Sequence, residues 1–275
     1  MFKKFLSLFA ALTLSVGLWA QSVGDKFVDE TSGLKFEITA VGETNTVKVI
    51  ANNYSGTSYT VPATVSYQSV TFNVTEIGYS AFVYCSGLTS VTIGNSVTTI
   101  GEMAFADCSG FTSVTIPNSV TTIGNGAFFD CVSLQSVTLS EGLITIGEMA
   151  FSMTGLTSIT IPASVTEIGI YAFYASSALT SVTFLGNACQ NAIGEMAFLS
   201  VGDPDPALLT LPDNWTGTKP DEDGTWYGGK FELREDPTAL PTLFGDGVKG
   251  NKFLHNGQLI IRKDNKTYNA VGQEL

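Results

Sequence analysis

The sequence predicts a mainly β solenoid, a coil of stacked supersecondary units that share one core. Three observations support this fold class: a short repeated unit, one strand-like segment in each repeat, and proline or glycine where the chain must turn. The clearest marker is an Ile-Gly-x-x-Ala-Phe segment. It occurs at residues 77–82, 100–105, 123–128, 146–151, 168–173 and 193–198. Successive phenylalanines of these segments are 23, 23, 23, 22 and 25 residues apart, a nearly constant period.

Each repeat also contains one segment in which polar and apolar residues alternate. In the pattern Ser-Val-Thr-Ile, the two apolar side chains point inward and the two hydroxyls point outward. Copies of this segment lie at residues 88–93, 111–116, 134–139, 156–161 and 179–184, and a degenerate copy ends at 209–211. Successive coils are expected to place these strands about 4.8 Å apart in one long parallel sheet.

Proline and glycine mark the points where the coil turns. Pro117, Pro162 and Pro212 directly follow strand segments, and proline lacks the N–H that a continuing ladder needs. In the Ile-Gly-x-x-Ala-Phe segment, glycine allows a tight turn, alanine allows close approach of backbones, and phenylalanine fills the core. Residues 102–107 are long enough for one or two helical turns. We therefore expect short helical or 3₁₀ segments opposite the sheet.

These residues resemble the BspA-like subclass of the leucine-rich repeat family of bacterial surface proteins. That subclass reads Leu-x-x-Ile-x-Ile-Pro-x-x-Val-x-x-Ile-Gly-x-x-Ala-Phe-x-x-Cys, and residues 111–131 follow it closely, with Phe111 at the opening position. The resemblance covers roughly half of the chain. It implies a curved, right-handed leucine-rich-repeat coil with the sheet on its concave side. It also implies binding of extracellular matrix components and co-aggregation.

The segments before the repeats have their own patterns. Residues 1–20 read as a secretory signal peptide, because Lys3 and Lys4 precede a short apolar stretch and Ala20 suits cleavage. Residues 21–73 lack the repeat but contain strand-like runs, so we expect an N-terminal β cap. The runs are residues 34–41, 46–50 and 58–61.

The leucine-rich repeat solenoid is expected to span residues 74–235, including a C-terminal cap. Trp215, Trp226 and Tyr227 are expected to help close that end, and the alternative for these residues is an aromatic ligand platform.

Two further segments are expected after the solenoid. Residues 236–252 contain prolines and glycines and read as a linker. Residues 253–275 look like a small β-hairpin tail. Residues 268–275 resemble part of the C-terminal sorting tails of Bacteroidetes-type bacteria, which direct export and surface attachment; the alternative is an ordinary β tail.

The charge distribution excludes two classes of partner. The chain has a formal net charge of −12, and residues 74–212 contain ten Asp or Glu and no Lys, Arg or His. A surface without cations cannot neutralise phosphates, so we expect neither nucleic acid nor an anionic membrane surface as a partner. A protein partner that binds the charged faces would be basic.

No residue pattern indicates catalysis, a cofactor or a metal. The only histidine, His255, lies in the tail, where a nucleophilic triad is implausible. Glu102, Glu148 and Glu195 recur at one repeat position, which indicates a solvated face rather than a catalytic pair. We therefore expect no enzymatic activity. The weak remaining candidates for hydrolysis are Asp203, Asp205 and Asp213.

Three cysteines occupy the same point of consecutive repeats: Cys85, Cys108 and Cys131. The next two repeats have Thr154 and Ser176 there. We expect these side chains to form an inward ladder, in which a small donor meets a turn carbonyl. Three neighbouring thiols cannot all pair, and Cys189 is off register, so we expect mostly free thiols. The spacing lacks the close pairs of a tetrahedral metal site.

The outward strand positions form a serine row and a threonine row, which we take as the candidate contact surface. Its members are Ser90, Thr92, Ser113, Thr115, Ser136, Thr138, Ser158, Thr160, Ser181 and Thr183, and the threonine row is expected to continue to Thr210. The rows either bind an extended protein or glycan or simply stabilise the strands.

We expect a secreted or surface-displayed, monomeric binding protein. Specifically, we expect an adhesin that contacts extracellular host or bacterial proteins, or glycans. The alternative is a non-binding structural or spacer protein of the cell envelope.

Overall fold

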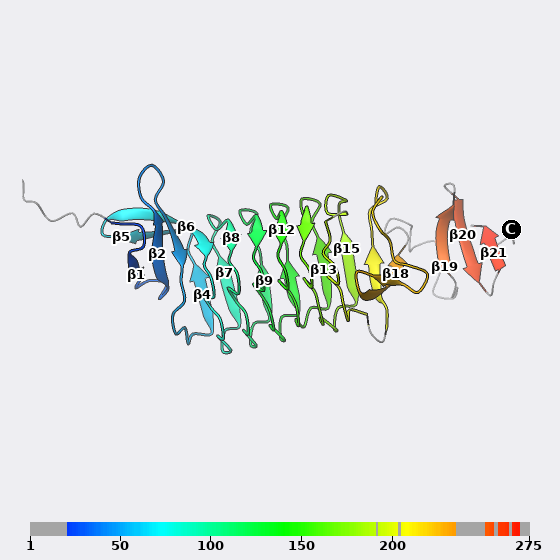
Figure 1. The fold of residues 1–275 in the computed structure, drawn as a ribbon, viewed down its shortest axis with the longest axis horizontal. Coiled ribbons are helices and arrows are strands. Elements are labelled where there is room, and N and C mark those ends of the chain that lie inside the picture. The colour runs from blue at the N-terminus through cyan, green and yellow to red at the C-terminus, as the bar shows by residue number, and fades with distance from the viewer. Residues whose placement is uncertain are drawn as a thin grey trace, which may run out of the picture.

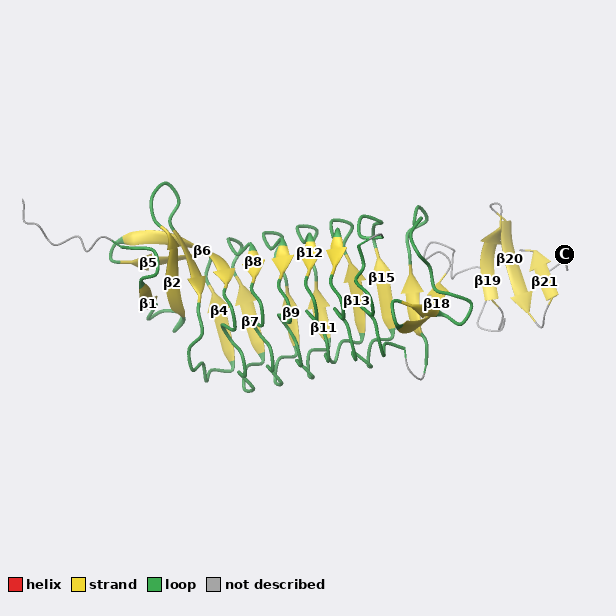
Figure 2. Cartoon of the chain, viewed as in Figure 1, coloured by secondary structure: helices red, strands yellow, loops and turns green. Residues whose placement is uncertain are grey.

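The computed structural model describes residues 21–190, 192–202 and 205–233, together with the backbone of residues 234, 251–255, 258–263 and 266–269. The expected signal peptide and most of the expected linker lie outside these residues. The described repeats form a β solenoid whose coils stack along one axis (Figure 1). Within the described part, no helix is present that could span a membrane, and the elements are strands and loops (Figure 2).

One strand from each coil forms the first row of the solenoid, and parallel, in-register pairing of neighbouring strands is confirmed. The row is divided into three sheets and is not the one long sheet that was expected, because β7 and β9, and β11 and β13, lie side by side without ladder pairing. Parallel pairing joins β4 to β7, β9 to β11, and β13 through β15 and β16 to β18. Val91, Val114 and Val137 point into the core, whereas the serine and threonine beside each valine point outward. The strands of this row are β4 (Ser58–Val61), β7 (Ser90–Ile93), β9 (Ser113–Thr115), β11 (Ser136–Thr138), β13 (Ser158–Ile161), β15 (Ser181–Phe184), β16 (Ala207–Thr210) and β18 (Gly229–Arg234).

A second parallel row, which the sequence did not predict, lies on another side of the coil. Each repeat contributes only a Thr-Ile or Glu-Ile pair, and these pairs align in register from coil to coil. The row continues beyond β14 through a single bridge between Ile168 and Ile193. Its strands are β3 (Thr46–Val49), β6 (Val70–Ile77), β8 (Thr99–Ile100), β10 (Thr122–Ile123), β12 (Thr145–Ile146) and β14 (Glu167–Ile168).

The Gly-x-x-Ala-Phe segments are consecutive turns, so the structure does not confirm the short helical or 3₁₀ segments expected there. Met103 and Asp107 have left-handed φ values of 55° and 58°, which interrupt a helical path. The N–H groups of Met103, Phe105 and Asp107 donate to carbonyls of the next coil at 2.8–2.9 Å. Because alternate N–H groups bond between coils, they are not available for hydrogen bonds within a helix.

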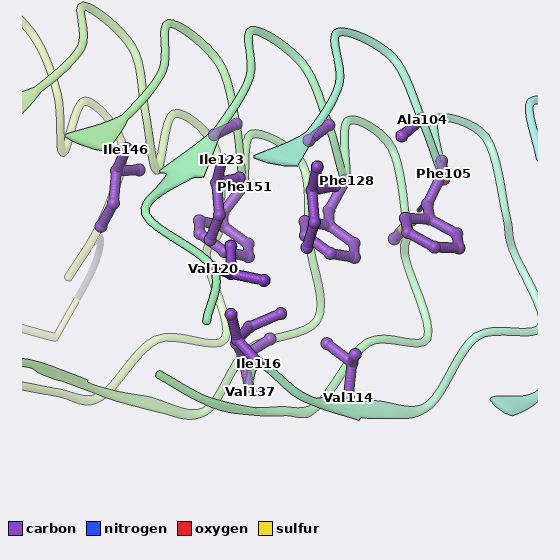
Figure 3. Packing of buried hydrophobic residues seen from close by; sticks show 14 of the residues in the cluster. Ala104, Phe105, Val114, Ile116, Val120, Ile123, Phe128, Val137, Ile146 and Phe151 are labelled. Atoms are coloured by element: carbon purple, nitrogen blue, oxygen red, sulfur yellow. Dashed lines mark hydrogen bonds between the residues drawn. The ribbon is translucent and has the colours of Figure 1, made fainter. Parts of the chain in front are cut away.

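The core of the solenoid is a ladder of stacked phenylalanine rings, one from each coil. Adjacent ring centroids are 5.1–5.5 Å apart and the planes differ by 2–11°. Figure 3 shows Phe105, Phe128 and Phe151 in this arrangement, surrounded by the isoleucines and valines of the two strand rows. The members of the ladder are Phe82, Phe105, Phe128, Phe151, Phe173 and Phe198.

Glycine recurs after each second-row strand because neighbouring coils touch there through their backbones. A Cβ atom on Gly124 would lie 2.7 Å from the backbone nitrogen of Glu102. A Cβ atom on Gly101 would lie 2.8 Å from the carbonyl oxygen of Ile77. Any larger residue would force the coils apart.

The N-terminal segment extends the second row. The strand-like runs at residues 34–41, 46–50 and 58–61 are found as β2 (Lys35–Ala40), β3 and β4. β1 (Lys26–Val28), β2 and β3 are antiparallel, and β3 pairs in parallel with β6. β5 (Thr64–Tyr67) forms an antiparallel pair with β6. Phe36 and Phe72 belong to the same buried cluster as the repeats, while the role of this segment as a cap stays a prediction.

The tryptophans at the other end of the repeats are core residues. Trp215 is 5% exposed and Trp226 2% exposed, and Trp226 stacks on Phe198 at 5.5 Å, continuing the phenylalanine ladder. Trp226 lies in β17 (Thr225–Trp226), which pairs with β18. Buried rings cannot receive a ligand on their faces, so the alternative of an aromatic platform was wrong for these two tryptophans.

The tail contains a three-stranded antiparallel sheet: β19 (Asn251–His255), β20 (Gln258–Lys263) and β21 (Lys266–Asn269). The expected hairpin corresponds to β20 and β21. β19 is an additional strand that begins within the expected linker. The position of this sheet relative to the repeats is not defined, because the residues between them lie outside the described part.

Candidate binding surface

The structure brings the predicted serine and threonine rows together on the outer side of the first strand row. In-register pairing places Ser113 beside Ser136 and Thr115 beside Thr138, and the same holds for Ser158 and Ser181 and for Thr160 and Thr183. The eight side chains from Ser90 to Thr160 are exposed, whereas Ser181 and Thr183 are half-buried. The ten predicted residues thus lie on one continuous surface.

Two members of this surface were missed in the sequence. Ser58 and Thr60 of β4 are exposed and pair in register with Ser90 and Thr92. Their segment reads Ser-Tyr-Thr-Val followed by Pro62, the same pattern as in the repeats, and this signal could have identified them. With these two residues, the surface spans six coils. We call the twelve residues the hydroxyl face.

Thr210 continues the threonine row in register, as expected, but the expectation that it points outward was wrong. Thr210 aligns with Thr183, but it is 5% exposed and lies between β15 and β18 near the end of the described repeats. The hydroxyl face therefore ends at β15.

The hydroxyls of this face are free of hydrogen bonds to protein groups in the described part of the chain. Other threonine rows differ. Thr89 donates to the carbonyl of Thr57 at 2.9 Å, Thr180 to that of Thr157 at 3.0 Å, and Thr98 to that of Thr75 at 3.1 Å. Those hydroxyls connect neighbouring coils, whereas the hydroxyl face keeps its donors and acceptors for water or a ligand.

The face is also uncharged, although the protein is acidic. Two of the carboxylates elsewhere, Asp107 and Asp130, occupy equivalent positions in adjacent coils. Burial raises the pKa of Asp107, and the charge of Asp130 and a hydrogen bond with it raise this pKa further. No cation forms an ion pair with either of these two residues in the described part; the ion pairs found there join Glu37 to Lys26 and Lys48.

The cysteine ladder has the predicted inward arrangement. Cys108 donates to the carbonyl of Phe82 at 3.0 Å and Cys131 to that of Phe105 at 3.1 Å, and Ser176 donates to that of Phe151 at 2.8 Å. All four cysteines are buried and free. Burial raises the pKa of the Cys131 thiol to about 12, and that of Cys189 to about 11. Such thiols are neutral at physiological pH and poor nucleophiles.

No group of three or more His, Cys, Asp or Glu residues that could hold a metal ion is found among the described residues. Asp205 and Asp213 are exposed, while Asp203 and the side chain of His255 lie outside the described part. Among the described residues, Asp205 and Asp213 belong to no such group. The leucine-rich repeat solenoid is a fold that typically serves as a non-enzymatic scaffold.

Comparison with protein families agrees with this geometry. Residues 75–201 match the family model described as a BspA type leucine rich repeat region, in six copies. The matched residues are a little less than half of the chain, and they contain all six Ile-Gly-x-x-Ala-Phe segments. The repeats are thus similar to those of BspA-type leucine-rich repeat proteins.

Solved structures with leucine-rich repeats are also similar. A leucine-rich repeat protein from Bacteroides ovatus is 25% identical with a TM-score of 0.50, and the match covers 77% of this chain and 65% of that protein. The chain therefore spans less than two thirds of its length. The leucine-rich repeat protein of T. pallidum is 24% identical with a TM-score of 0.52, covering 66% of this chain and 95% of that one, and shows the fold alone. The comparison with curated proteins gave no match.

Proposed function

We propose that this chain is a secreted or surface-displayed binding protein, an adhesin that uses its hydroxyl face to contact extracellular host or bacterial proteins, or glycans. The proposal rests on one observation. Twelve outward hydroxyls from six coils share one uncharged face, and none of them hydrogen-bonds to the protein in the described part. The hydroxyls of Thr89 and Thr98, by contrast, donate to carbonyls of the preceding coil.

The energetics favour an extended partner. A single hydrogen bond contributes only about 0.5–1.5 kcal/mol, so useful affinity requires several of them at once. Because the hydroxyls repeat identically from coil to coil, a partner that shifts along the face by one coil would meet the same groups, so these rows provide little specificity. Specificity would therefore come from the loops and the ends of the solenoid, which differ from coil to coil.

Localisation and partner class follow the same proposal. The N-terminal signal predicted at residues 1–20 would export the chain, and leucine-rich repeat proteins commonly mediate protein–protein interactions. The absence of Lys, Arg and His from residues 74–212 disfavours nucleic acid and anionic membranes. The chain is proposed to act as a monomer.

The test is binding of the purified chain, from Gln21 onward, to immobilised matrix proteins, mucins and glycans. The decisive variant replaces Thr115, Thr138 and Thr160 by valine, which removes hydroxyls but suits exposed strands. The matched control replaces Thr98 and Thr121 by valine as well. Their hydroxyls lie outside the hydroxyl face and donate to carbonyls of the preceding coil. Saturable binding that the first variant loses and the control keeps supports the proposal.

Two other outcomes would count against it. No binding across the panel by the folded protein favours the alternative of a structural or spacer role in the cell envelope. Binding that weakens with salt and survives the valine substitutions would place the contact on the acidic surfaces instead.

A further inference from the structure

The sixth repeat opens a groove between two coils. The step from Phe173 to Phe198 is the longest of the five steps, 25 residues against the usual 23, because the segment 187–191 lengthens this repeat. At this point the second row is reduced from a two-residue pair to the single bridge between Ile168 and Ile193. The groove has a volume of about 370 Å³ and is open to solvent. Its lining residues are 166–170 and 192–194.

The groove combines apolar walls with carboxylates beside them. Ile170 is 44% exposed, and the nearby Met196 is 45% exposed, although both are large and apolar. Glu167 lines the groove and Glu195 directly follows the lining Gly194, and both are exposed. Neither carboxylate has a cationic partner in the described residues, where the ion pairs found involve Glu37. This surface fits a partner that is both apolar and basic.

The chain itself contains such a partner. Residues 249–269 carry five Lys or Arg and one acidic residue, in contrast to residues 74–212, which carry no Lys or Arg. The strand β20 reads Gln-Leu-Ile-Ile-Arg-Lys, with apolar residues next to basic ones. We define β19, β20 and β21 as the tail sheet.

The tail sheet can reach the groove. Sixteen residues, 235–250, join it to β18, and an extended segment of that length spans about 50 Å. Along the solenoid axis, the groove lies about three strand spacings, or about 15 Å, from the last strand of the first row, and the second row on which it lies is on another side of the same coils. Because the connection is short, the local concentration of the tail sheet near the groove is in the millimolar range.

We propose that the groove between the fifth and sixth repeats is the docking site for the tail sheet of the same chain. The basic residues in the sequence of the tail sheet complement the charge of Glu167 and Glu195, and its apolar residues complement Ile170 and Met196. Docking neutralises the acidic charge beside the groove and covers the exposed side chains of Ile170 and Met196. The proposal is independent of the hydroxyl face and of any external ligand.

Amide hydrogen exchange of the whole chain tests the proposal. Peptides that cover residues 166–170 and 192–196 are expected to exchange slowly in the parent protein. Replacing Arg262 and Lys263 by glutamate is expected to increase their uptake several-fold, and high salt is expected to do the same to the parent protein. Combining this change with Glu167→Lys and Glu195→Lys is expected to restore slow exchange.

The control replaces Glu102 by lysine. This residue occupies the same repeat position as Glu195 but lies outside the groove, in an earlier coil, so exchange at the groove is expected to stay unchanged. Unchanged uptake after both the Arg262/Lys263 reversal and high salt would overturn the proposal. An equal effect of the control would also overturn it. Protection that appears only in a concentration-dependent dimer would overturn docking within one chain, and light scattering distinguishes that case.

Discussion

Replacing Phe128 by alanine tests whether the phenylalanine ladder holds the coils together. Phe128 is fully buried and stacks on Phe105 at 5.2 Å and on Phe151 at 5.2 Å, with planes 6° and 2° apart. A buried Phe→Ala change costs about 3–5 kcal/mol. Each aromatic pair contributes about 0.5–1.5 kcal/mol beyond its buried area. Phe128 also stacks on Phe111, with ring centroids 6.3 Å apart. Because three pairs are lost, we expect the upper half of the range, about 4–5 kcal/mol.

The ladder also predicts how two such changes combine. Once Phe105 is alanine, Phe128 has already lost its pair with that ring and keeps the pairs with Phe111 and Phe151. The adjacent double variant should therefore be about 0.5–1.5 kcal/mol more stable than the sum of the single effects predicts. Phe105 and Phe173 are separated by two other ladder rings and share no contact. That double variant should be additive within about 0.5 kcal/mol.

Urea unfolding followed by circular dichroism measures these free energies of unfolding by linear extrapolation. The matched control is Phe129→Ala, one residue along the same turn, where the side chain is only half-buried and the cost should be about 1 kcal/mol. A loss at Phe128 no larger than that at Phe129 would refute the reasoning. Equal coupling in the adjacent and distant pairs would also refute it.

Three further changes separate other features of the fold. Gly124→Ala should lower the free energy of unfolding in urea by about 1–3 kcal/mol, because its Cβ would press on the preceding coil. Gly87 has open space around it, so Gly87→Ala should leave this free energy unchanged or raise it by up to about 1 kcal/mol. Equal effects of the two variants would contradict the packing argument. Burial raises the pKa of Cys131 to about 12, so the stability that this thiol contributes should be complete below about pH 8.5 and decline as pH rises towards 12. Cys131→Ser keeps a donor but does not ionise in this range, so its urea midpoint should fall less than that of the parent protein between these pH values. Burial and Asp130 raise the pKa of Asp107, so the stability that Asp107 contributes is present below about pH 3.9 and is lost as pH rises through the raised pKa. Asp107→Asn should therefore increase the free energy of unfolding more at pH 7 than at pH 3. An equal effect of the variant at the two pH values would exclude repulsion between Asp107 and Asp130.

The sequence predicted the first strand row well because its signal is local and repeated. The Ser-Val-Thr-Ile alternation fixes which side chains face the core, and the repeat period fixes the register between coils. The second row escaped prediction because each coil contributes two residues. A pair such as Thr122–Ile123 is too short for an alternation to be recognised, and it pairs only because its neighbours repeat it.

The turns and the end of the hydroxyl face depended on tertiary contacts. Met103 adopts a left-handed backbone although methionine has no preference for it, because its N–H reaches the carbonyl of Asn125 in the next coil. The burial of Thr210 depends on the strands near the end of the described repeats, which differ from the regular coils. A single-repeat pattern contains neither of these constraints.

The constant pairing register between coils makes the gain or loss of a whole repeat structurally simple. From β8 to β12, successive coils contact each other through equivalent pairs of strands, rings and glycines. A coil inserted or removed as one whole repeat would meet neighbours that already fit it, and no new interface would have to arise. In-frame duplication or loss of a single repeat would therefore lengthen or shorten the hydroxyl face by one step without redesigning the fold.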